Sequence, residues 1–101
     1  MSKFEWEDTK NKSNRQKHSI SFEKAKEVFQ DEKAVEFRGN DPTELRIMRV
    51  GKTFSKILIA VVYTVRSAVI RIISARQASK KETKAYLENS LSKQAADENK
   101  N

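Results

Sequence analysis

An uninterrupted apolar run at residues 57–63, ILIAVVY, constrains the fold of this chain more than any other feature. Seven apolar residues without polar alternation fit a central β-strand that is covered on both faces. The run is far shorter than the ~20 residues that span a bilayer. Only TVRS separates it from a second apolar stretch at 68–75, AVIRIISA, which is close enough to form a hairpin. We therefore expect an antiparallel sheet to form the core.

Two further strands are expected before this hairpin, at residues 34–37 and 45–50, with the turn sequence GNDP between them. Together the four strands make an antiparallel meander. A short strand is also possible at residues 4–6, where apolar and acidic residues alternate.

Helices are expected on either side of the meander. Residues 9–17, with Asp8 as the cap, form a helix that has almost no apolar face, so packing alone does not explain its stability. Residues 22–30 follow a helical period after the potential cap Ser21. Ser79 and Glu82 have the spacing of a capping box and begin a C-terminal helix. The predicted class is α+β, with one domain over residues 1–93 and a disordered polar tail over residues 94–101.

Basic residues are concentrated in the second half of the chain. Residues 1–50 carry 11 basic and 10 acidic groups, whereas residues 51–101 carry 10 basic and 4 acidic groups. Such an excess attracts polyanions, of which nucleic acid is the commonest, although an acidic protein partner or a generic basic surface would show the same pattern. With no Cys and one His, the chain lacks thiolate chemistry and most histidine metal sites.

Two arginines of the last expected strand are candidates for binding an anion. Arg71 interrupts an apolar strand, and strict alternation places it on the face of Val69, Ile73 and Ala75. A charge there needs either a cleft that receives an anion or a carboxylate partner such as Glu5 or Glu36. Arg76 ends the strand, and together with Lys80 and the amides of the following helix it could cradle a phosphate.

Other side chains allow both a chemical and a structural reading. His18 suits proton transfer near neutrality, or it is a cation that stabilises a helix end. Trp6 and Tyr63 could stack on a base, or they belong to the core. Glu5, Glu7 and Asp8 could hold magnesium, but alternation and helix capping explain them more simply, and we expect no metal site.

Taken together, these residues resemble the BrnT family of toxins over about residues 3–86. The resemblance rests on the F-E-W opening, the K-H step after the polar helix and the block I-R-I-I-S-A-R. It is supported by Lys10, Asn14, Phe22, Glu23, Ala25, Val28, Phe29, Asp31, the segment V-V-Y-T, Arg66, Ala78, Glu82 and Tyr86.

This resemblance implies a RelE-like fold and a type II toxin, an endoribonuclease that cuts RNA without metal or cofactor and inhibits translation. A cytoplasmic location is expected separately, because no stretch is long enough to span a bilayer and the N-terminus lacks the apolar region of a signal peptide. Its partner would be a ribbon-helix-helix antitoxin that forms a hetero-oligomer with it, and the complex would bind promoter DNA. In this reading Arg71 and Arg76 stabilise the phosphate, and His18 with Lys17 supplies proton transfer or a further cation. The predicted RNA-binding residues are Arg66, Lys80, Lys81 and Tyr63.

Two positions depart from the family pattern. Ser19 stands where the family commonly has Gly, and Gln77 stands where a second Arg is expected. Gln77 removes one cation from the predicted site. An alternative function is therefore a degenerate toxin, a basic binding module that holds its antitoxin and nucleic acid without cutting RNA.

Overall fold

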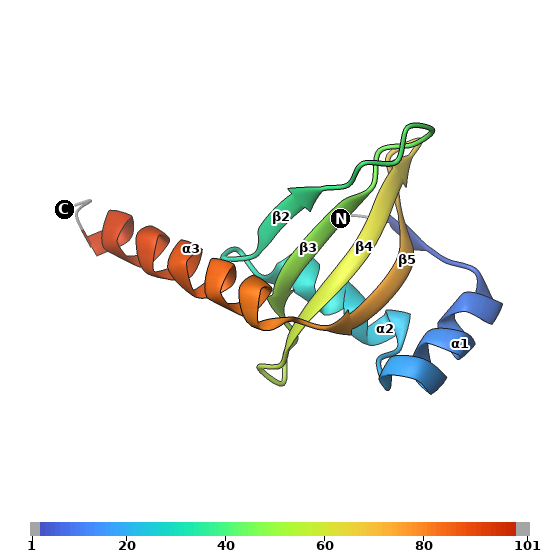
Figure 1. The fold of residues 1–101 in the computed structure, drawn as a ribbon, viewed down its shortest axis with the longest axis horizontal. Helices are drawn as coiled ribbons and strands as arrows, with labels where there is room; N and C mark the ends of the chain where they lie inside the picture. Colours follow the sequence, from blue (N-terminus) through green and yellow to red (C-terminus); the bar gives the residue numbers. More distant parts are fainter. Residues whose placement is uncertain (1–2, 99–101) are drawn as a thin grey trace.

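The structure is a computed structural model that describes residues 3–98. Its centre is a five-stranded sheet with the order β1-β5-β4-β3-β2 (Figure 1). The meander of four antiparallel strands is confirmed, and the short N-terminal strand joins it as a fifth strand parallel to β5. The strands are β1 (Lys3–Glu5), β2 (Val35–Arg38), β3 (Ile47–Lys52), β4 (Leu58–Arg66) and β5 (Val69–Gln77).

Four helical segments surround the sheet: α1 (Asp8–His18), α2 (Phe22–Ala25), the 3-10 helix η1 (Lys26–Gln30) and α3 (Lys80–Glu98). The helix expected over residues 22–30 thus divides into an α-helical and a 3-10 part. Ser21 caps it as predicted, because its hydroxyl accepts from the Lys24 amide at 3.0 Å. The prediction of Asp8 as a cap is wrong, because Glu7 occupies the cap position without a side-chain bond. No helix within residues 3–98 has the length and apolarity needed to cross a membrane.

The main core lies between the sheet and the helices α2 and η1. Trp6 packs edge-on against Phe22 with ring centroids 6.0 Å apart, which confirms its structural reading. The buried side chains of this layer come from the apolar positions predicted for the second helix and the central hairpin, and they are Ile20, Phe22, Ala25, Val28, Ile59, Val61, Ile72 and Ala75.

A β-bulge in β5 decides which face of the sheet its arginines share. Val62 pairs with Ser74, but Tyr63 pairs with Ile72, so Ile73 is an extra residue without a partner. The prediction that Arg71, Ile73 and Ala75 share a face is therefore wrong, since Ala75 is buried in the core on the helix side. Arg71 pairs with Thr64 and Arg76 with Ala60, and these alternate positions of β4 lie on the opposite face.

The first turns of α3 cover one end of that opposite face. The capping box is confirmed: the Ser79 amide donates to Glu82 at 2.8 Å, and the Glu82 amide donates to the Ser79 hydroxyl at 3.1 Å. Tyr86 packs with Val50 and Ala60 in a second, smaller core. The helix continues to Glu98 and so includes the first part of the segment expected as a tail, whereas residues 99–101 lie outside the described range.

Candidate active site

Hydrogen bonds from a buried asparagine attach α1 to the edge of the sheet. The Asn14 amide donates to the carbonyls of Ile20 at 2.9 Å and Ala75 at 2.8 Å, and its oxygen accepts from the Ala75 amide at 3.1 Å. The carboxamide thereby pairs with β5 as a neighbouring strand would, beyond the last residue that pairs with β1. Since Asn14 is only 6% exposed, these bonds are shielded from water.

Asn11 attaches the same helix to α2. Its side-chain oxygen accepts from the Phe22 amide at 2.8 Å, and its amide donates to Glu23 at 2.9 Å. The latter bond is the main reason why the pKa of Glu23 lies below its ordinary value. Sequence reasoning missed both asparagines as anchors. The available signal was that they stand three residues apart, on one side of a helix without an apolar stripe.

The anchored helix ends with two predicted site residues, Lys17 and His18, which are both exposed. Ser19 follows in the left-handed conformation with φ 59°, and its amide donates to the Arg15 carbonyl at 2.9 Å. This is the position where the family pattern has Gly, and the backbone keeps the glycine-type turn despite the side chain. His18 comes one turn after Asn14 on the same side of α1, and Asn14 is fixed to Ala75.

The guanidinium of Arg76 is engaged within the protein. It forms a two-pronged ion pair with Glu82, at 2.8 Å for Nη1 and 2.9 Å for Nη2. Nη1 also donates to the Gln77 carbonyl at 3.2 Å, and Nη2 approaches the Met48 sulfur at 3.6 Å. The Arg76 bond is the largest cause that lowers the pKa of Glu82 to about 2. Arg76 therefore ties the end of β5 to the first turn of α3.

Lys80 and Lys81 lie in that first turn and are exposed. Within the described residues neither forms an ion pair. Figure 1 shows that α1 ends, β5 ends and α3 begins at the same end of the sheet. The structure thus brings five of the eight predicted site residues to one end of the sheet: Lys17, His18, Arg76, Lys80 and Lys81.

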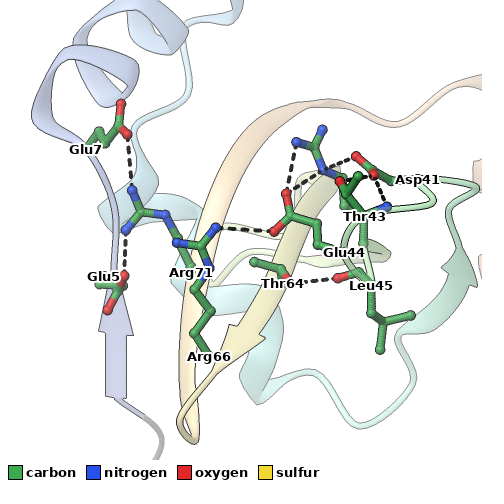
Figure 2. Close-up of polar contacts among 10 residues, drawn as sticks. Glu5, Glu7, Asp41, Thr43, Glu44, Leu45, Thr64, Arg66 and Arg71 are labelled. Atoms are coloured by element: carbon green, nitrogen blue, oxygen red, sulfur yellow. Dashed lines mark hydrogen bonds and ion pairs between the residues drawn. The ribbon is translucent and has the colours of Figure 1, made fainter.

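Arg71 lies near the opposite end of β5 and is paired with two carboxylates of the N-terminal segment. Its Nη1 lies 2.5 Å from Glu5 and its Nη2 3.1 Å from Glu7 (Figure 2). The salt bridge to Glu5, one of the two partners expected for a structural role, is confirmed. Five residues along a strand separate Arg71 from Arg76 by about 15 Å. In this structure the two guanidiniums are held by different carboxylates, Arg71 by Glu5 and Glu7 and Arg76 by Glu82.

Arg66 belongs to the same end as Arg71 and pairs with Glu44 at 3.4 Å. Glu44 in turn pairs with Arg46 at 3.2 Å, and Arg46 also approaches Asp41 at 3.4 Å. Figure 2 shows Arg66 and Arg71 lying side by side between these two groups of carboxylates. Three arginines and four carboxylates make this end of the sheet close to neutral, unlike the lysine-rich end around Arg76.

Tyr63 is placed away from either group of cations. It is 7% exposed, its ring packs edge-on against Phe29 at 4.9 Å, and its hydroxyl donates to Glu36 at 2.5 Å. Burial and this bond raise the pKa of Tyr63 above its ordinary range. The ring offers no open face to a base, so the predicted stacking role of Tyr63 does not fit the structure.

The acidic residues of the N-terminal segment do not gather around a common point. Glu5 and Glu7 both bind Arg71, and Asp8 begins α1. Among residues 3–98, no group of three or more histidine and carboxylate side chains is arranged to hold a metal ion.

Comparison with known proteins identifies the family. The family model described as "Ribonuclease toxin, BrnT, of type II toxin-antitoxin system" matches residues 6–82. This chain belongs to the BrnT family. The match contains His18, both arginines of β5 and the Arg76–Glu82 pair, so all the predicted site residues lie within the BrnT region.

A solved BrnT structure shows the same fold. The crystal structure of the ribonuclease toxin BrnT from Brucella abortus aligns with a TM-score of 0.63 and 25% sequence identity. The alignment covers 79% of this chain and all of the Brucella chain. No curated protein matches the chain. As a BrnT ribonuclease toxin of a type II system, the protein has RNA as its substrate and an antitoxin as its partner.

Proposed function

We propose that this BrnT chain cleaves RNA without a metal ion at the end of the sheet where α1, β5 and α3 meet. In the cytoplasm this cleavage inhibits translation, and a ribbon-helix-helix antitoxin neutralises the toxin in a hetero-oligomer that binds promoter DNA. The observation that carries the proposal is the Asn14 bridge to Ala75, which holds the end of α1 beside the residue that precedes Arg76.

The proposed reaction uses the ribose 2′-hydroxyl as the nucleophile. The 2′-oxygen bonds to the adjacent phosphorus as the bond to the 5′-oxygen breaks, which leaves a 2′,3′-cyclic phosphate and a free 5′-hydroxyl. His18 is the proposed proton-transfer group, because imidazole commonly exchanges protons near neutrality. Lys17, Lys80 and Lys81 supply positive charge to the phosphate as negative charge builds on its oxygens.

Arg76 has a positioning role in this scheme. Both terminal nitrogens of its guanidinium bind the Glu82 carboxylate. Arg76 therefore holds the first turn of α3, which carries Lys80 and Lys81, against the end of β5. This differs from the direct phosphate contact expected from the sequence. If the arginine at this end of β5 positions α3 rather than binding the phosphate, the loss of a second arginine at Gln77 removes less from the site than the sequence suggested.

Arg66 and Arg71 are proposed to bind the RNA backbone away from the bond that is cut. The side chains that pair with Arg71 are 42% exposed for Glu5 and 50% exposed for Glu7, so a phosphate can compete with them for the guanidinium. A separation of about 15 Å from Arg76 corresponds to a few nucleotides of extended RNA. These arginines would therefore affect affinity more than the chemical step.

The experiment is cleavage of a labelled single-stranded RNA by the purified chain in EDTA. We expect cleavage with a 2′,3′-cyclic phosphate end, and none when the ribose at the cut site carries a 2′-O-methyl group. His18→Ala should lose about 10²-fold to 10⁴-fold in rate, the usual contribution of proton transfer, and should lose its toxicity while still binding the antitoxin. Cleavage that stops in EDTA and returns with magnesium would contradict the proposal.

One observation favours the alternative of a binding module. Both arginines of β5 are already paired with carboxylates. Neither can stabilise the phosphate during cleavage without a change in its contacts, whereas a module that only binds RNA does not need this stabilisation. If the folded chain binds the RNA but leaves it intact, with and without ribosomes, the module is the better description.

A further inference from the structure

An aromatic side chain that the proposed reaction does not use projects from the turn between β3 and β4. Phe54 is 68% exposed, which makes it the most exposed large hydrophobic residue in the described part of the chain. An isolated exposed phenylalanine is costly in water and gains most when a flat apolar partner covers it.

The turn that presents Phe54 is firmly built. The Thr53 amide donates to the Ile57 carbonyl at 2.9 Å, and the Lys56 amide donates to the Thr53 carbonyl at 2.9 Å. The Phe54 amide donates to Glu27 of η1 at 2.8 Å, which fixes the turn to the body of the protein. The backbone that carries the exposed ring is therefore fixed before any ligand arrives, so little backbone entropy is lost on binding.

Phe54 borders a hollow of about 520 Å³ between the turn, η1 and the side of α3. This volume lies in the range of sites for small ligands and suits one nucleotide. Tyr86 lies at its α3 side, and Lys33, Lys52 and Lys56 contribute to its lining. The hollow thus combines an exposed aromatic ring with three ammonium groups and three carboxylates, those of Glu27, Asp31 and Glu32.

The carboxylates and the lysines that line the hollow differ in how many bonds they already form within the protein. Asp31 accepts from the amides of Lys33 and Lys52 and from the Tyr86 hydroxyl, and Glu27 accepts from Phe54. By contrast, none of the three lysines joins an ion pair within the described residues. The three ammonium groups are thus available to a ligand, whereas two of the three lining carboxylates, Asp31 and Glu27, already accept hydrogen bonds from residues 3–98 and only Glu32 does not. A fitting ligand is therefore rich in acceptors and has a flat ring.

The hollow lies close to the proposed reaction centre. The Leu58 carbonyl, at the start of β4, accepts from the Ala78 amide at 3.2 Å, so the β3–β4 turn is next to the junction between β5 and α3. A strand of RNA that crosses this junction can reach the hollow with a neighbouring nucleotide.

We propose that this hollow binds one nucleotide of single-stranded RNA that flanks the cut site. The base stacks on Phe54, and Lys33, Lys52 and Lys56 bind its phosphate or its carbonyl oxygens. The inference rests on the proposed function for the identity of the ligand. It assigns the stacking role, which the sequence suggested for Tyr63, to a residue on the surface.

Binding of a 2′-O-methyl RNA, which resists cleavage, tests the inference separately from catalysis. Phe54→Ala should weaken affinity about 5-fold to 100-fold, the range for one stacked base, whereas Phe54→Trp should keep it and lose fluorescence on binding. Leu91→Ala, which removes another exposed apolar side chain (66% exposed), serves as the matched control and should change nothing. Lys56→Gln should flatten the dependence of log affinity on log salt by about 0.7.

A second arm separates stacking from a general effect on the surface. Removing one base from the RNA at the position next to the cut should weaken wild type but not Phe54→Ala. Equal affinity of wild type and Phe54→Ala would overturn the inference, even if wild type cleaves RNA. An effect of Phe54→Ala on antitoxin binding alone would also overturn it, because the hollow would then belong to a protein interface.

Discussion

The two ends of β5 present the same kind of ion pair with opposite consequences. At one end Arg76 pairs with Glu82, whose side chain is only 12% exposed and also accepts from the Ser79 amide. At the other end Arg71 pairs with Glu5 and Glu7, which are 42% and 50% exposed. The burial of the carboxylate, rather than the arginine itself, decides whether a pair anchors the fold or exchanges with a ligand.

This contrast suggests different roles for the two ends of β5. The Arg76 end fixes the first turn of α3, with Lys80 and Lys81 that form no ion pair among residues 3–98, at the end of the sheet where α1 also ends, which suits a reaction centre. The Arg71 end balances its arginines with surface carboxylates, which suits reversible contact with a polyanion (Figure 2). The β-bulge at Ile73 makes this arrangement possible, because it puts both arginines on one face despite an odd spacing.

The largest effect on stability is expected at the partly buried pair of Arg76 and Glu82. Arg76→Ala leaves the carboxylate of Glu82, which is 12% exposed, without its main partner. Because Arg76 itself is 42% exposed and water screens the pair in part, we expect the free energy of unfolding to fall by about 2 to 3 kcal/mol. Arg71→Ala leaves two exposed carboxylates that water can solvate, and should unfold close to wild type. Urea unfolding of both variants measures the difference. Equal losses for the two variants would remove the distinction between anchor and exchangeable pair.

A smaller effect on the free energy of unfolding is expected when the pH is lowered. Bonding to Arg76 lowers the pKa of Glu82 from its ordinary value of 4.5 to about 2. A carboxyl whose pKa is depressed on folding stabilises the protein above its ordinary pKa, and this stabilisation is lost as pH falls towards the folded value. Wild type should exceed Glu82→Gln in unfolding free energy by about 2 kcal/mol at pH 6, and the gap should close between pH 4.5 and pH 2. A gap that stays constant over this range would show that the ionised carboxylate is not the source.

The sequence predicted the meander, the capping box and the second helix because each depends on local periodicity or on residues a few positions apart. It did not predict what holds α1, since Asn14 binds a residue 61 positions away and asparagine carries no periodic signal. The bulge was missed for a related reason. Strict alternation was assumed along β5, and one unpaired residue reverses the face of everything beyond it.

The candidate site was predicted as a list of residues, but not as an arrangement. His18, Lys17, Lys80 and Lys81 do lie at one end of the sheet with Arg76, whereas Arg66 and Arg71 lie at the other and Tyr63 is buried. The role of each arginine depends on the carboxylates that pair with it. Some of these carboxylates come from segments that are remote in sequence, such as Glu5 for Arg71. Charge counts along the chain do not reveal such pairings.

The most direct test of this division is single-turnover cleavage of a labelled RNA over a range of enzyme concentrations, with His18→Ala and Arg71→Ala compared with wild type. We predict that His18→Ala lowers the maximal rate by about 10²-fold or more with the same half-saturating concentration. Arg71→Ala should raise the half-saturating concentration and keep the maximal rate. A fall in maximal rate for Arg71→Ala as large as that for His18→Ala would contradict the account, because both ends of β5 would then act in the chemical step.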